Sequence, residues 1–262
     1  MSNTMTTTRP HEAPTKGVAQ SSQPLANRWL LLALVPTVLA LIAYVLRFVV
    51  HTKAQTISEM VPLTAALICI AILRTKRNPV PDTTTARPTP HTSYIWLWAL
   101  VVAFSMSIIG DLFLHYHTTN TGYMLGIAFF LLAHLGYLTY ALKRVAFRWP
   151  VFFVIVAALL VLYFVFFLPS PTLKSSLPMA VAVLAYLLVS CFSWAASIDI
   201  SSRSLARWVF TAGISSIVIS DACLALNDFA GLHQFDAPIM PLYFLAHVLV
   251  AFSVVLEFTR RH

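Results

Sequence analysis

The sequence predicts an all-α membrane protein with eight transmembrane helices packed in one bundle, and three observations predict it. Apolar and aromatic residues make up 59% of the 262 residues and charged residues only 10%, whereas soluble domains have roughly 45–50% and about 25%. The apolar residues form eight stretches, most of them near the roughly 20 residues that cross a ~30 Å hydrocarbon layer. The basic residues fall mainly between these stretches. A soluble enzyme, a secreted disulfide scaffold and a disordered chain are therefore excluded as the main body.

The eight stretches define one transmembrane domain over residues 29–258. Residues 1–28 are rich in Thr, Ser, Pro, Gln and Asn, which predicts a disordered cytoplasmic tail. The Pro- and Thr-rich stretch 74–93 is expected to be an exposed cytoplasmic loop. The second stretch is the weakest prediction, because it is short and contains Glu59 and Pro62. The expected helices are 29–50, 57–73, 94–114, 122–142, 150–168, 177–198, 205–226 and 238–258.

The distribution of Lys and Arg predicts the orientation in the membrane. With eight spans, 14 of the 17 basic residues lie on one side, and only Arg47, Lys53 and Lys174 lie on the other. Because short cytoplasmic loops carry an excess of Lys and Arg, both termini are expected in the cytoplasm, with the protein in a plasma or inner membrane. An odd number of spans would destroy the asymmetry. The net charge of +8 is explained by membrane anchoring, so no nucleic-acid partner is expected.

Two pairs of similar motifs indicate an internal repeat. The third stretch ends in Ser-Ile-Ile-Gly-Asp111-Leu-Phe-Leu, and near its end the seventh contains Ser-Ile-Val-Ile-Ser-Asp221-Ala-Cys-Leu. The fourth contains Phe-Leu-Leu-Ala-His134 and the eighth Tyr-Phe-Leu-Ala-His247. Four spans separate the copies, so both copies point the same way through the membrane. This spacing predicts a parallel four-plus-four repeat, an arrangement found in some transporters.

The repeat places two acids at the same depth. At about 1.5 Å per residue, Asp111 and Asp221 lie about 25 and 24 Å from the inner ends of their helices, in the outer third of the membrane. His134 and His247 are expected nearer the midplane, and Glu59 at the outer start of its helix. An intramembrane carboxylate costs roughly 2.5–3.5 kcal/mol and is rarely without a function. The alternative to a functional role for the two acids is that each is hydrated near the interface or caps a helix. The alternative for the two histidines is a structural role, as a buried imidazole hydrogen-bonded to a neighbour.

Five short motifs follow one another along the chain: Pro62-Leu-Thr, Gly110-Asp111, Phe130-Leu-Leu-Ala-His134-Leu-Gly-Tyr137, Ser220-Asp221-Ala-Cys-Leu-Ala-Leu-Asn227-Asp-Phe and Tyr243-Phe-Leu-Ala-His247. In this order they resemble the lysoplasmalogenase family of YhhN-like integral membrane proteins, and the resemblance runs from about residue 29 to 258. One departure is Val61, which stands where family members often carry Lys before Pro-Leu.

The resemblance implies hydrolysis of the vinyl-ether bond of a lysoplasmalogen to a fatty aldehyde and a glycerophospho-base. That chemistry needs a proton donor, a base for water and negative charge near a cationic intermediate. Asp111 and Asp221 could supply all three if the pair shared one proton, and they are the expected catalytic residues. No metal or cofactor is expected. The substrate-binding or supporting residues are expected to be Glu59, His134, Tyr137, Asn227, Tyr243 and His247.

Two other functions remain open from the sequence. A proton-coupled transporter of lipids or small molecules could use the same intramembrane Asp residues and the same repeat. A metal-dependent lipid hydrolase could use His115, His117 and an Asp, since Asp111 and His115 share a helix face, but further ligands at diagnostic spacing are missing. The expected partners are a lysophospholipid and the bilayer, and the sequence leaves the oligomeric state and the head group open.

Overall fold

All the residues that the computed structural model describes lie in helices or short connections, with no β-strand among them. The described residues are 35, 38–39, 42, 55–77, 95–116, 119–142, 147–200 and 204–259. The predicted tail, most of the predicted helix 29–50 and most of the predicted loop 74–93 lie outside them. The long helices are α2 (Gln55–Arg77), α3 (Ile95–Tyr116), α4 (Asn120–Leu142), α5 (Trp149–Leu162), α7 (Leu177–Ile200), α8 (Leu205–Ala230) and α9 (Asp236–Thr259).

The protein is a multi-pass membrane protein. Within the described residues, six segments are long and apolar enough to cross a membrane, and α2 adds a shorter apolar stretch, Val61–Ile72. A helix satisfies its backbone hydrogen bonds internally, which a segment in lipid requires. The count of eight spans stays a prediction. The six segments are Trp96–Leu114, Asn120–Leu142, Trp149–Phe167, Leu177–Ile198, Leu205–Ala230 and His233–Phe258.

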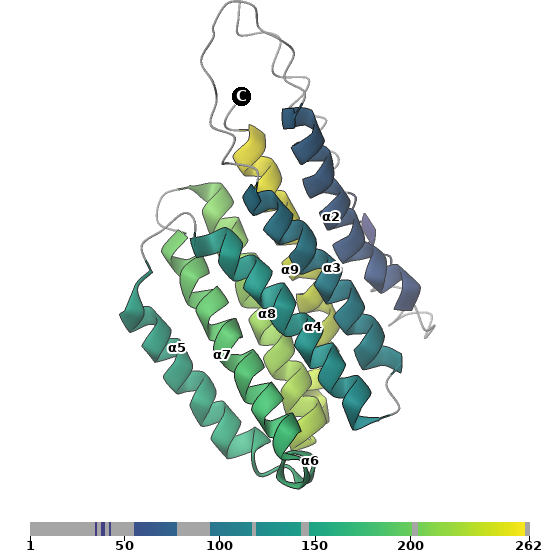
Figure 1. The fold of residues 1–262 in the computed structure, drawn as a ribbon, viewed down its shortest axis with the longest axis vertical. Helices are drawn as coiled ribbons and strands as arrows, with labels where there is room; N and C mark the ends of the chain where they lie inside the picture. The colour runs from purple at the N-terminus through teal and green to yellow at the C-terminus, as the bar shows by residue number, and fades with distance from the viewer. Residues whose placement is uncertain are drawn as a thin grey trace, which may run out of the picture.

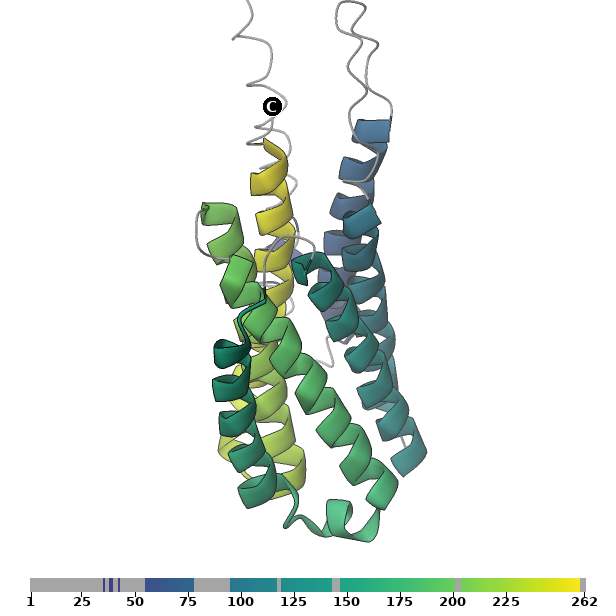
Figure 2. The same ribbon diagram turned by 60° about the vertical axis from the view of Figure 1, so that its left-hand side comes forward.

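Successive long helices run in opposite directions along the bundle (Figures 1 and 2). As a result, α2, α4, α7 and α9 all end where the C-terminus lies, which we call the C-terminal end. The short helix α6 (Pro171–Ser175) lies at the other end, which we call the α6 end. The helix ends that flank the basic segments therefore gather at the C-terminal end, and a cytoplasmic location for that end stays a prediction.

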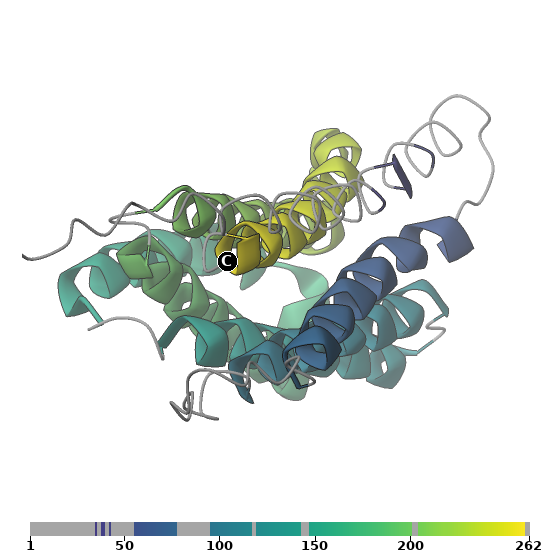
Figure 3. The same cartoon turned by 90° about the horizontal axis from the view of Figure 1, so that it is seen from above.

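The most extensive helix contacts are between α8 and α9 and between α3 and α4, and glycines allow both pairs to approach closely. A Cβ added to Gly136 would lie 2.7 Å from the carbonyl oxygen of Ala99 and 2.8 Å from Cβ of Ala103. One added to Gly213 would lie 2.8 Å from Cγ2 of Val250. Small residues at such positions let helix backbones pack closely where lipid gives no hydrophobic driving force. Seen from above, α9 lies beside α2, which it also contacts (Figure 3).

Two helices differ from the predicted ranges in ways that matter for the site. The predicted helix 150–168 is α5 followed by a π-helical turn, Tyr163–Phe167, where the Tyr163 hydroxyl donates to the Ala180 carbonyl oxygen at 3.0 Å. The predicted helix 205–226 continues to Ala230 and ends at Gly231, whose φ of 68° favours glycine. Asn227 and Asp228, which follow the predicted end of this helix, therefore lie in the last turns of α8.

Candidate functional site

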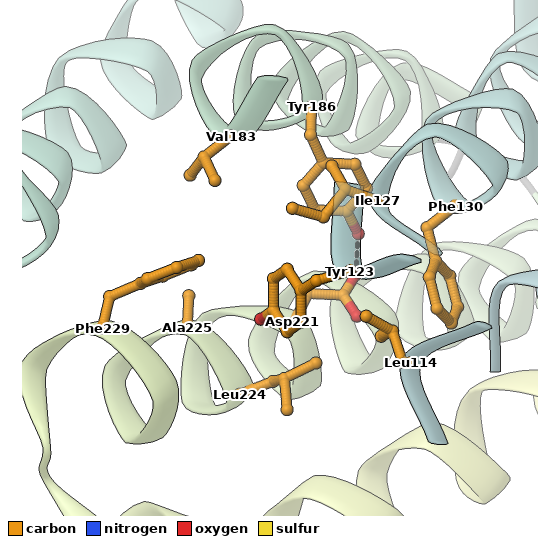
Figure 4. Close-up of a pocket in the computed structure, with 10 residues that line it drawn as sticks. All are labelled: Leu114, Tyr123, Ile127, Phe130, Val183, Tyr186, Asp221, Leu224, Ala225 and Phe229. Carbon is orange, nitrogen blue, oxygen red and sulfur yellow. Dashed lines mark hydrogen bonds between the residues drawn. The ribbon is translucent and has the colours of Figure 1, made fainter. Parts of the chain in front are cut away.

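A pocket lies toward the α6 end, where α3, α4, α7 and α8 meet (Figure 4). It holds about 400 Å³ of empty space, counting the part open to the surroundings. Its polar lining residues are Tyr123, Tyr186 and Asp221. The rest of the wall is apolar, which suits a hydrocarbon chain. The larger apolar side chains are Leu114, Ile127, Phe130, Val183, Leu224 and Phe229.

Asp221 of α8 is held in this pocket by groups from two other helices. The hydroxyl of Tyr186, on α7, donates a hydrogen bond to Oδ2 of Asp221. Nε2 of His134, on α4, lies 3.3 Å from the same oxygen and 3.1 Å from the Tyr186 hydroxyl. The His134 side chain is 1% exposed and that of Asp221 15%. The carboxylate is thus fixed on one side and reaches the pocket on the other.

Asp111 of α3 is held by α9 in a second cluster. The Tyr243 hydroxyl donates a hydrogen bond to Oδ2 of Asp111, and the Tyr243 ring lies 4.3 Å from that of His247, centroid to centroid. Nδ1 of His247 lies 2.8 Å from the Tyr243 carbonyl oxygen. Because a carbonyl only accepts, Nδ1 carries the hydrogen. Nε2 of His247 is buried and has no hydrogen-bond partner within the described part of the chain.

Tyr137 links the two clusters. Its ring lies 6.0 Å from that of His134 and 6.0 Å from that of Phe104, which in turn lies 5.7 Å from the His247 ring. The rings of Tyr137 and Phe104 therefore lie between the two clusters.

The structure gathers most of the residues that the sequence singled out and places Asn227 apart from them. Asp111, Asp221, His134, Tyr137, Tyr243 and His247 lie in the linked clusters. Asn227 lies beyond them on α8, where its amide donates to Oδ1 of Asp228 at 3.0 Å. The Glu59 side chain lies outside the described part. Each carboxylate accepts a hydrogen bond from its own tyrosine, so proton sharing between the two acids stays a prediction.

Sequence reasoning missed Tyr186, which is the main partner of Asp221. The available signal was a phenol in the middle of an apolar stretch, where an unpartnered hydroxyl is costly. That signal predicts a partner but does not identify it. Tyr123 was missed for the same reason.

The described side chains contain no group of three or more His, Cys, Asp or Glu that could hold a metal ion. The metal-dependent alternative used His115 and His117. His117 and the side chain of His115 lie outside the part of the chain that the structure describes. The clusters above offer carboxylate, phenol and imidazole groups as acids, bases and hydrogen-bond donors.

The fold and the site define a polytopic helical membrane protein with a buried carboxylate–phenol–imidazole region beside an apolar pocket. The model of the YhhN family matches residues 83–254. The chain therefore belongs to the YhhN family, which includes lysoplasmalogenases, and the resemblance is confirmed for the motifs between residues 83 and 254. No curated protein and no solved structure matches the chain.

Proposed function

We propose that this protein is a membrane-embedded hydrolase that cleaves the vinyl-ether bond of lysoplasmalogens. The observation that carries the proposal is the carboxyl group of Asp221 at the wall of an apolar pocket, held by Tyr186 and His134. Membership of a family that includes lysoplasmalogenases supports the same reaction.

The apolar lining of the pocket suits a lipid with one chain. Its leucine, isoleucine, valine and phenylalanine side chains can contact the alkenyl chain. The pocket lies toward the α6 end, so the head group would lie at that membrane surface and the vinyl ether near Asp221. A bound lipid chain would displace water from most of the pocket, and the electrostatic interactions that the reaction needs are stronger where water is excluded.

The reaction begins with proton transfer from a carboxylic acid to the β-carbon of the vinyl ether. The π electrons form the new C–H bond, and the α-carbon becomes an oxocarbenium ion. Water adds to this carbon and loses a proton to a carboxylate, giving a hemiacetal. The hemiacetal then loses its hydroxyl proton and breaks its bond to the glycerol oxygen, which takes up a proton. One water is consumed, the products are a fatty aldehyde and a glycerophospho-base, and no oxidant is needed.

Asp221 is the better placed proton donor, because it lines the pocket. Asp111 is its partner in a paired-carboxyl mechanism in which the two groups share one proton, so that one acts as acid while the other is charged. The negative charge left on the pair also stabilises the oxocarbenium ion. Tyr186 and Tyr243 hold the two carboxyl groups in place.

Aldehyde release from a lysoplasmalogen tests the proposal. The purified protein in neutral detergent would be compared with Asp221→Asn and Asp111→Asn, which keep the side-chain shape and remove the titrating proton. Asp236→Asn is the matched control, since Asp236 is an exposed acid at the same end of the bundle. We expect the control to release aldehyde at the wild-type rate and both Asp variants to release it far more slowly. A folded wild-type protein that binds the lipid and releases no aldehyde would refute the hydrolase proposal.

A proton-coupled transporter is the alternative, supported by the two intramembrane carboxylates. A transporter needs a path to the C-terminal end in some state, and large buried side chains fill that half of the bundle, among them Phe104, Tyr140 and Phe210. Proteoliposomes distinguish the two: accumulation of intact lysolipid driven by a proton gradient supports transport, and aldehyde release without a gradient supports hydrolysis.

A further inference from the structure

One face of α8 carries a second acid in line with Asp221. Asp228 lies seven residues after Asp221, which in a helix is two turns and nearly the same face. At about 1.5 Å per residue the separation is about 10.5 Å along the axis. Leu224 and Ala225 lie between them and line the pocket. This face thus leads from the candidate reacting group to the end of the helix.

Neighbouring residues hold the Asp228 carboxylate in a fixed orientation. The Tyr123 hydroxyl donates to Oδ2 at 2.8 Å, and the Asn227 amide donates to Oδ1 at 3.0 Å. Asp228 is exposed, whereas Tyr123 and the adjacent Phe229 line the pocket. The carboxylate therefore stands at the edge of the pocket. Each of its oxygens accepts one hydrogen bond from the described residues, and a carboxylate has about four acceptor sites.

We propose that Asp228, held by Tyr123 and Asn227, binds the primary ammonium group of an ethanolamine head group. The inference rests on the proposed function, because it places the vinyl ether at Asp221. The ten bonds from the vinyl-ether carbon to the ammonium nitrogen span about 12 Å when extended, from bond lengths of about 1.5 Å. This length is close to the separation of the two acids, so a single lipid contacts both.

The chemistry of the edge selects a primary ammonium over the other common head groups. A primary ammonium has three N–H donors for the carboxylate, whereas trimethylammonium has none and depends on open aromatic faces. Phe229 is only 8% exposed, and its ring contacts Tyr123 edge to face at 5.8 Å, so the two rings do not form an open cage. An uncharged glycerol head group gains no attraction from Asp228. No Lys or Arg is among the residues that line the pocket.

Binding of ester lysolipids tests the head-group site without requiring hydrolysis. Palmitoyl lysophosphatidylethanolamine, lysophosphatidylcholine and lysophosphatidylglycerol would compete with a lysophosphatidylethanolamine labelled on its chain, in neutral maltoside micelles at a fixed lipid-to-detergent ratio. We expect the ethanolamine lipid to bind about fivefold more tightly than the other two, the upper end for an exposed charged pair. Chain-free glycerophosphoethanolamine, as a further competitor, distinguishes a lipid site from a site for the free amine.

Variants assign the preference to Asp228. Asp228→Asn should remove the preference for ethanolamine, and Tyr123→Phe, which keeps the ring but releases the carboxylate, should reduce it about twofold. Asp236→Asn, a charge change at the same end away from the pocket, should leave it unchanged. Equal or tighter binding of the choline lipid by the wild type, or a preference that survives Asp228→Asn, would overturn the site. An ethanolamine preference without aldehyde release would refute the hydrolase proposal while the site stands.

Discussion

Asp221 and Asp111 occupy similar motifs but different surroundings. Asp221 lines a pocket and has hydrogen-bonding partners on α4 and α7. Asp111 accepts from Tyr243 of α9, next to an apolar cluster of Val61, Phe130, Tyr243 and Phe244. Similar sequence therefore does not give the two acids the same surroundings, because the helix that faces each acid decides its partners and its access to the pocket.

The apolar cluster around Tyr243 is well buried, since Val61 within it is fully buried and Phe244 is 2% exposed. The comparison leads to a ranking in which changes at Asp221 have the larger effects.

Asp221→Asn should have the largest effect. We expect kcat for aldehyde release to fall about 10³-fold, within the range for loss of a general acid–base group. The fall should be in kcat rather than KM, because the amide keeps the shape of the pocket wall. Steady-state kinetics with a coupled aldehyde assay measure this, and a variant that keeps more than a tenth of wild-type kcat would contradict the role of Asp221 as proton donor.

Asp111→Asn should have a large but smaller effect. We expect kcat to fall about 10²-fold, because the partner charge is lost while the donor stays in the pocket. A double variant with Asp221→Asn should lose little more than Asp221→Asn alone, since the two groups act as a unit. Additive losses in the double variant would show that the two acids act independently.

Tyr186→Phe and Tyr243→Phe compare the two clusters directly, since each removes the hydroxyl that donates a hydrogen bond to one of the two carboxylates. We expect Tyr186→Phe to lower kcat about tenfold, the value of one hydrogen bond to a charged group. Tyr243→Phe should lower it by less, because its carboxylate is not in the pocket wall. The same kinetics measured over a range of pH check both. A larger effect at Tyr243 would reverse the ranking of the two acids.

Gly136→Ala tests the packing of α4 on α3, and Gly213→Ala tests the packing of α8 on α9. These two changes should have the smallest effects. The added methyl overpacks a helix contact at a cost of about 1–3 kcal/mol, and the better helix propensity of Ala returns about 1 kcal/mol. We expect a net loss of about 1 kcal/mol from each, and more at Gly136, where the nearest atoms are a backbone oxygen and a Cβ. Thermal unfolding in detergent measures this, and an unchanged Tm for both would contradict the close packing.

The sequence by itself determined the class of fold and several members of the site. Long apolar stretches in so weakly charged a chain can only be stable as helices in a membrane, because lipid offers no partners to an open backbone. The approximate positions of the described helices follow from those stretches. Burying a polar group in lipid is costly, so polar residues within these stretches are candidates for a functional site even before their partners are known. The sequence therefore identified Asp111, Asp221, His134 and His247.

Only the tertiary structure decided which of these residues meet. The periodicity of an apolar helix is weak when nearly every face is apolar, so the sequence could not show that Tyr186 of α7 faces Asp221, or that Tyr243 faces Asp111. The end of α8 was also undetermined, and with it the alignment of Asp228 with Asp221. Partners across a bundle depend on helix rotation and depth, which close packing at residues such as Gly136 and Gly213 fixes and local sequence does not.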